Sequence, residues 1–163
     1  MCDQEKIQPN MQKYLNYKEQ FKRLNRALSN GFNLEAIFIE YAIIEDRTES
    51  IIRHSGCWDA YIRCRKGHSV TLDSKIRFIQ KNAECKKDLM HRYFADNVLE
   101  QLLDWKEKRN RLIHALLKQQ LGDNDIYDLA VHGNDLVKVL RNKSGNYNRA
   151  IERLHNEMKQ RIN

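Results

Sequence analysis

The sequence predicts an all-α protein, an up-and-down bundle of about five or six helices. Only one proline, Pro9, and six glycines interrupt the 163 residues, so long segments contain no helix breaker. Within these segments apolar residues recur at three- and four-residue steps, the period of a helix with one buried face. The apolar share of 41% is that of a globular chain, and the length suits one hydrophobic core. We therefore expect a single domain over residues 1–163.

The apolar stripes and the breakers between them place the individual helices. Asn30-Gly31 and Ser55-Gly56 end the first two helices, and Ser144-Gly145-Asn146 separates the last two. Residues 57–70 are expected to form a loop or a short helix, and residues 84–94 a short connecting segment. The predicted helices are, in chain order, residues 10–29, 34–54, 71–81, 96–119, 124–143 and 147–162.

The charge balance adds polyanions to the expected partners. Lys and Arg number 29 against 22 Asp and Glu, a formal net charge of +7, and a basic domain attracts nucleic acid. The first ten residues are polar and do not resemble a signal peptide, and no apolar run approaches the roughly 20 residues that span a bilayer. We expect a cytoplasmic protein with no membrane partner, whose four cysteines stay reduced.

The helix predicted over residues 96–119 carries an arginine on its apolar side. At about 100° per residue, Arg109 falls near the middle of the apolar arc. Burying an arginine costs several kcal/mol unless the charge is paired, so Arg109 needs a carboxylate partner or a cleft. The apolar residues of this arc are Val98, Leu102, Trp105, Leu112, Ile113 and Leu116.

The second predicted helix offers that carboxylate. Glu45 occupies a position where its stripe would otherwise be apolar, and we predict that Glu45 faces Arg109, with Asp46 as the less favoured partner. The alternative is that the pair is a static ion pair inside the bundle. The inward positions on which this prediction depends are Leu34, Phe38, Tyr41, Glu45, Thr48 and Ile52.

The six residues from Arg109 to His114 carry groups suited to RNA cleavage by transesterification. A histidine can take or give a proton near neutral pH, and an arginine offers planar donors to a phosphate. Asn110 lies one turn before His114 on the same side and could orient the imidazole or hold a phosphate oxygen. Arg111 and Lys118 flank His114 and could contact neighbouring phosphates or remain solvated charges.

The pattern Arg109-Asn110-x3-His114 resembles the signature of the HEPN superfamily of small helical domains. The loose spacing of Arg and His occurs four times in the chain, but only here does Asn, Asp or His follow the arginine directly. The resemblance implies a metal-independent endoribonuclease without a cofactor, whose site forms where two copies of the motif meet in a homodimer. It also implies a toxin or abortive-infection role, with a possible antitoxin or regulatory partner. Leu116 replaces the tyrosine that follows the histidine in one toxin branch, which puts control through that position in doubt.

Three other interpretations remain open at this point. His54, Cys57, Cys64 and His68 have a zinc-ligand composition, although their spacing is unlike that of zinc fingers. The chain could instead be a non-catalytic helical binding module in which the polar pair serves the fold. Finally, Trp58 and Tyr61 could stack nucleic-acid bases or pack onto the bundle. The basic residues around these aromatics are Arg53, Arg63, Arg65 and Lys66.

Overall fold

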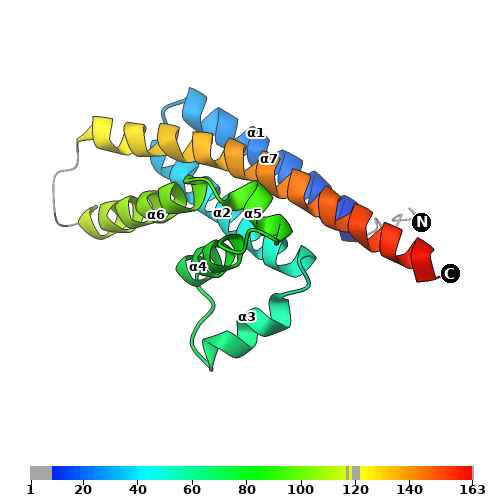
Figure 1. Ribbon diagram of the computed structural model, residues 1–163. Helices are drawn as coiled ribbons and strands as arrows, with labels where there is room; N and C mark the ends of the chain where they lie inside the picture. Colours follow the sequence, from blue (N-terminus) through cyan, green and yellow to red (C-terminus); the bar gives the residue numbers. More distant parts are fainter. Residues whose placement is uncertain (1–8, 117, 119–121, 163) are drawn as a thin grey trace, which may run out of the picture.

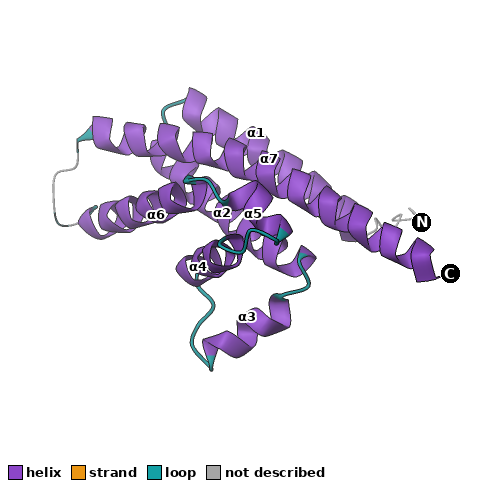
Figure 2. Cartoon of the chain, viewed as in Figure 1, coloured by secondary structure: helices purple, strands orange, loops and turns teal. Residues whose placement is uncertain are grey.

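The computed structural model describes residues 9–116, 118 and 122–162. Over this part of the chain the protein is helical, with seven α-helices, short connections and no strand (Figures 1 and 2). None of the described helices combines the length and the apolar composition needed to cross a membrane. The helices are α1 (Pro9–Ser29), α2 (Asn33–His54), α3 (Trp58–Arg65), α4 (Leu72–Ala83), α5 (Leu89–Phe94), α6 (Val98–Ala115) and α7 (Asp123–Ile162).

Helix α2 lies at the centre of the bundle and contacts α1, α3, α4 and α7. Ile37, Ile44 and Ile51, spaced seven residues apart along α2, are all fully buried, because neighbours cover this helix on more than one side. The turn from α1 into α2 needs a left-handed residue, which Gly31 supplies at φ 73° without a side-chain clash. Helix α2 is therefore the element on which α1, α3, α4 and α7 pack.

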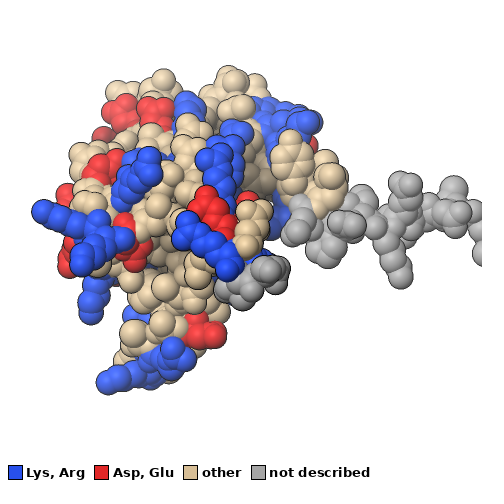
Figure 3. Space-filling view, turned by 45° about the vertical axis from the view of Figure 1, so that its right-hand side comes forward, with Lys and Arg blue, Asp and Glu red and all other residues tan. Residues whose placement is uncertain are grey.

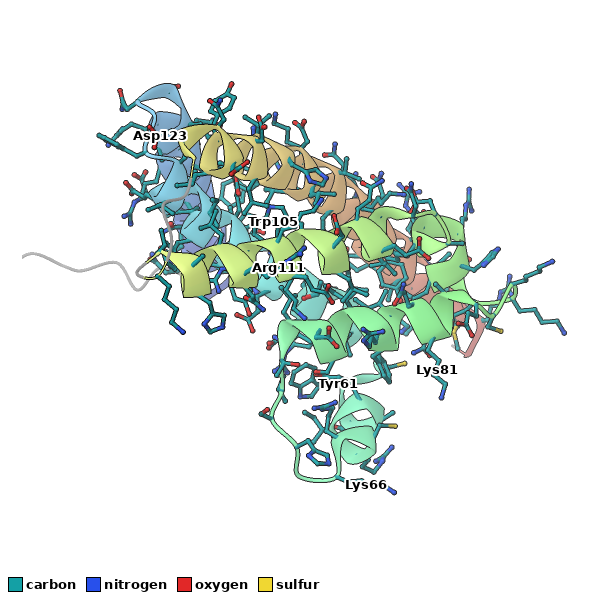
Figure 4. All side chains as sticks on the ribbon, turned by 90° about the vertical axis from the view of Figure 1, so that its left-hand side faces the viewer. Tyr61, Lys66, Lys81, Trp105, Arg111 and Asp123 are labelled. Carbon is teal, nitrogen blue, oxygen red and sulfur yellow. The ribbon has the colours of Figure 1, made fainter. Side chains whose placement is uncertain are left out.

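Helices α6 and α7 pack on each other and close the core. Trp105 of α6 is fully buried, and its indole Nε1 donates a hydrogen bond of 3.0 Å to the Leu129 carbonyl oxygen of α7. Figure 4 shows Trp105 between these two helices. Burial of a tryptophan removes much apolar surface from water, and the hydrogen bond satisfies its one polar group, so this contact ties α6 to α7.

The all-α prediction is confirmed, whereas the number and the bounds of the helices differ from it. Residues 57–70 and 84–94 contain the short helices α3 and α5, and the two helices expected after residue 123 form one continuous helix, α7. The local break at Ser144-Gly145-Asn146 is overridden by tertiary packing. Ser144 is fully buried, and Tyr147 packs edge-on against Phe94 of α5 with ring centroids 5.5 Å apart.

Helix α3 and the turn after it extend from the bundle, with Lys66 at the far end (Figure 4). Tyr61 is 1% exposed and its hydroxyl lies 2.6 Å from the Ser74 hydroxyl, while the Arg53 guanidinium covers the Trp58 ring at 3.7 Å. These aromatics pack onto the bundle, so the base-stacking interpretation of this segment is not supported.

The zinc interpretation also lacks support. No group of three or more His, Cys, Asp or Glu residues in the described ranges lies close enough to hold a metal ion. His54 instead places its Nδ1 atom 2.8 Å from the Ser50 carbonyl oxygen within α2.

Candidate active site on α6

Helix α6 holds the Arg109–His114 motif in its last two turns. An ion pair of 2.8 Å between Lys108 and Asp104 joins successive turns of the helix, and the sequence has no glycine or proline over its length. Most of the predicted apolar arc is buried, with Ile113 and Leu116 half-buried at the end of the helix. The buried residues of that arc are Val98, Leu102, Trp105 and Leu112.

Arg109 lies on the inward side of α6, as predicted, and is half-buried. Its guanidinium carbon is 4.6 Å from the centroid of the Tyr41 ring and 5.3 Å from that of Phe38, both on α2. Nη1 donates a 3.2 Å hydrogen bond to Asn110 Oδ1, whereas Nε is buried without a partner among the described residues. Cation–π contact therefore takes the place of the expected carboxylate.

The predicted pairing of Arg109 with Glu45 is wrong. Glu45 lies 3.5 Å from the Lys75 ammonium of α4, a side chain only 3% exposed that also binds Glu49 at 3.0 Å. In the described part of the chain no carboxylate comes within 4.0 Å of Arg109. Lys75 was not predicted from the sequence, although it shares the buried side of α4 with Leu72, Ile76 and Ile79.

Asp46, the second predicted partner, is also engaged elsewhere. Its carboxylate lies 2.6 Å from Arg47 and 3.0 Å from Lys13 of α1. Partial burial works to raise the Asp46 pKa, but the hydrogen bonds from Arg47 and Lys13 outweigh it and hold the pKa below its ordinary value. Asp46 therefore stays ionised and belongs to the α1 side of the molecule.

Asn110 and His114 lie one helical turn apart near the end of α6. Asn110 is half-buried through its contact with Arg109, whereas His114 is exposed. Within the described residues the His114 ring makes no hydrogen bond that would fix its tautomer or occupy its nitrogens. The imidazole is thus open to a ligand, while the Arg109 guanidinium is held against Tyr41 and Asn110.

Arg111 and Lys118, the predicted phosphate contacts, are both exposed. Figure 4 labels Arg111 on α6. Arg111 also lines a groove of about 690 Å³ between α6 and α7, together with Asp128 and His132 of α7. The geometry therefore leaves Arg111 available to a polyanion, although the groove that it lines is distinct from the surface around His114.

The carboxylate buried on α2 is Glu40, which the sequence analysis did not single out. Glu40 is fully buried, and neither carboxyl oxygen has a hydrogen-bond partner among the described residues. Gly133 of α7 provides the room, because a Cβ there would collide with Glu40 Oε2 and lie 2.7 Å from Trp105 Nε1. Two signals pointed to this contact: Glu40 lies on the Ile37–Ile44–Ile51 stripe, and Gly133 interrupts the buried stripe of a helix.

Burial also decides the charge of Glu40. Loss of hydration raises the Glu40 pKa to about 9, and the nearby Asp135 charge acts in the same direction. The carboxyl group is therefore neutral at pH 7. The closed contact of Glu40, Trp105 and Gly133 fixes α6 against α2 and α7 just before the motif begins.

Comparisons with protein-family models, with curated protein sequences and with solved structures find no match to this chain. The resemblance to HEPN domains accordingly stays a prediction from the motif.

Proposed function

We propose that this chain is a metal-independent endoribonuclease that cleaves RNA by transesterification. The observation that carries the proposal is that the last two turns of α6 carry both an open imidazole, His114, and a guanidinium, Arg109, that is pre-oriented against Tyr41. In this reaction the 2′-oxygen loses its proton and attacks the adjacent phosphorus. The bond from phosphorus to the 5′-oxygen then breaks, and that oxygen gains a proton.

His114 serves as the general acid/base of this reaction. A histidine has an ordinary pKa of about 6.5, so the imidazole can accept the 2′-hydroxyl proton or supply the one that the leaving 5′-oxygen needs. Its exposure allows the scissile phosphate to approach within hydrogen-bond distance.

Arg109 stabilises the charge that builds on the phosphate. The contact with Tyr41 and the hydrogen bond to Asn110 restrict the guanidinium before RNA binds, so less conformational entropy is lost on binding. Preorganised donors of this kind commonly contribute several kcal/mol to lowering a barrier. Asn110 orients Arg109 directly, and Arg111 and Lys118 contact the flanking phosphates.

A second copy of the chain completes the site in this proposal. Phe38 lies beside Arg109 and is 50% exposed, which leaves an apolar ring next to the motif for a partner surface to cover. Two facing motifs would supply one histidine and one arginine each. A toxin or defence protein of this kind needs restraint, and an antitoxin-type partner that covers His114 would provide it.

The test is a cleavage assay in EDTA on a labelled RNA with a single-stranded loop. We expect the wild-type chain to cut and His114→Ala to lose at least a hundredfold in rate, because the proton-transfer group is absent. The matched control is His155→Ala, which removes an exposed histidine of α7 that follows Arg149 at a similar spacing. This variant should cut at the wild-type rate.

The competing candidate is a non-catalytic binding module. The packing of Arg109 against Phe38 and Tyr41 favours it, since a structural arginine would be held in the same way. Absence of cleavage by the folded protein on a panel of RNAs would reject the ribonuclease and favour this candidate. Equal cleavage by wild type and His114→Ala would reject the assigned role of His114.

A further inference from the structure

A second concave surface lies on the other side of α2, where α1 and α7 both pack against that helix. The groove between them has a volume of about 700 Å³, a size typical of ligand pockets. Its floor is formed by the C-terminal half of α2, and one wall contains Gly145, at which an added Cβ would meet nothing within 4 Å. Gly145, which lies within the continuous helix α7, has no side chain and therefore leaves this part of the groove open.

The groove is lined by cationic side chains and by no carboxylate among the described residues. Asp46 lies next to it and pairs with Lys13 and Arg47. Arg141 makes no ion pair within the described ranges, and Lys18 is exposed. In Figure 3 basic side chains gather next to the point where the grey N-terminal residues join α1. The cations that line the groove are Lys13, Lys18, Lys22, Arg47 and Arg141.

Aromatic rings alternate with these cations along α1. The Arg47 guanidinium carbon lies 4.0 Å from the Tyr17 ring centroid, and that of Arg141 lies 4.8 Å from the Phe21 centroid. Tyr14 of α1 lines the same groove and is 62% exposed. Its ring is therefore available for a planar group to stack on.

Tyr17 adds a hydrogen-bond donor inside the groove. Its hydroxyl oxygen is buried and has no hydrogen-bond partner among the described residues. Burial raises the Tyr17 pKa well above its ordinary value, more than the adjacent Arg47 charge lowers it, so the hydroxyl keeps its proton. A buried donor without an acceptor favours a ligand that brings one.

We propose that this groove binds single-stranded nucleic acid. Phosphates would contact Arg141 and Lys18, a phosphate or base oxygen would accept from Tyr17, and a base would stack on Tyr14. Charge favours a polyanion, and the exposed ring favours one whose bases are unpaired, because duplex bases present no free face.

This site is separate from the proposed catalytic surface. Tyr41, which orients Arg109, and Arg47, which lines the groove, are six residues apart on α2. At about 100° per residue they point in directions roughly 120° apart. The proposal therefore does not depend on cleavage, and a probe that cannot be cleaved tests it alone.

The probe is a fluorescein-labelled 12-nucleotide 2′-O-methyl oligouridine, whose binding to the full chain is followed by fluorescence anisotropy. Gly145→Trp fills the groove from a helical position with open space around it, and we expect at least a tenfold loss of affinity. Arg141→Gln should weaken binding about three- to tenfold and make the slope of log K against log salt concentration shallower by about 0.7. Lys138→Gln, an exposed lysine of the same helix that pairs with Asp135, is the control and should bind as wild type does.

Three outcomes would overturn the proposal. The first is wild-type affinity in both groove variants, and the second is an equal loss in Lys138→Gln, which would indicate diffuse attraction to a basic surface. The third is uridine monophosphate binding as tightly as the oligonucleotide, which would indicate a mononucleotide pocket. If circular dichroism shows that Gly145→Trp does not fold, the affinity of Arg141→Gln still tests the proposal. Arg141 is exposed, so this substitution should leave the fold intact.

Discussion

The two halves of α6 have opposite surroundings. The half that ends at Trp105 is closed: Val98, Leu99 and Leu102 are buried, and the indole lies against Gly133 and the neutral Glu40. The half that contains Arg109 and His114 is open, with an exposed imidazole and a half-buried guanidinium. One helix thus joins a tightly packed anchor to a surface that carries reactive groups.

Under the proposed function, this difference keeps the groups assigned to the reaction accessible on a helix that is held at its other end. The closed half contributes the burial and the shape fit that hold the helix, and these contributions are large. The open half contributes little to stability, so its residues are free to serve chemistry. Substitutions in the closed half should therefore change the free energy of unfolding, and those in the open half should change activity.

The largest loss of stability is expected for Trp105→Ala. Removal of this fully buried ring leaves a cavity and loses the hydrogen bond from the indole to the Leu129 carbonyl oxygen, and we expect the free energy of unfolding to fall by about 3–5 kcal/mol. Urea unfolding followed by circular dichroism measures it. Tyr127→Ala, at a ring of α7 that is 53% exposed, is the control and should cost less than about 1 kcal/mol. Similar losses in both variants would contradict the closed contact.

Gly133→Ala should have the next largest effect. The added methyl group would overlap Glu40 and Trp105, both fully buried, so we expect a loss of about 1–3 kcal/mol. Gly145→Ala is the matched control in the same helix, and it should be neutral or stabilising by up to about 1 kcal/mol, since alanine favours a helix and its Cβ meets open space. A thermal melt of the two variants in one buffer compares them. A larger loss of stability in Gly145→Ala than in Gly133→Ala would show that α7 does not closely approach Glu40 and Trp105 at Gly133.

Glu40→Gln should change how stability depends on pH. From about pH 4.5, the ordinary pKa, to about 9, the folded chain keeps the Glu40 proton that the unfolded chain releases. The free energy of unfolding therefore falls as pH rises through this window. Glutamine does not titrate, so we expect the variant to gain at least about 1 kcal/mol relative to wild type between pH 5 and pH 8. Urea titrations at the two pH values test this, and a constant difference would contradict the neutral state of Glu40.

Glu45→Ala should have the smallest effect of the four. Glu45 is 40% exposed in its side chain, and Glu49 continues to bind Lys75, so we expect a loss below about 1 kcal/mol. Double-mutant cycles identify the partner: the coupling free energy should be measurable with Lys75→Met and near zero with Arg109→Ala. A coupling free energy between Glu45 and Arg109, with none between Glu45 and Lys75, would show that Glu45 pairs with Arg109 after all.

The sequence predicted the helical class and the inward position of Arg109, because both follow from periodicity within single helices. It did not identify the partner of Arg109, because that depends on which side of α2 meets α6. The predicted stripe placed Phe38 inside, whereas this ring is 50% exposed and Glu40 is buried. Neighbours cover α2 on several sides, so its apolar pattern does not define one inward direction. Continuity of α7 through Gly145 likewise depends on the packing of Tyr147, which no local rule contains.

The ends of the RNA products test the central claim most directly. If His114 and Arg109 act on the 2′-hydroxyl and the adjacent phosphate, fragments made in EDTA will carry a 2′,3′-cyclic phosphate and a 5′-hydroxyl. A substrate with a single 2′-deoxy nucleotide at the cut site will then resist cleavage there. Mass spectrometry of the fragments gives both results. Products with 3′-hydroxyl and 5′-phosphate ends, or cleavage of the deoxy substrate at the same bond, would contradict the account.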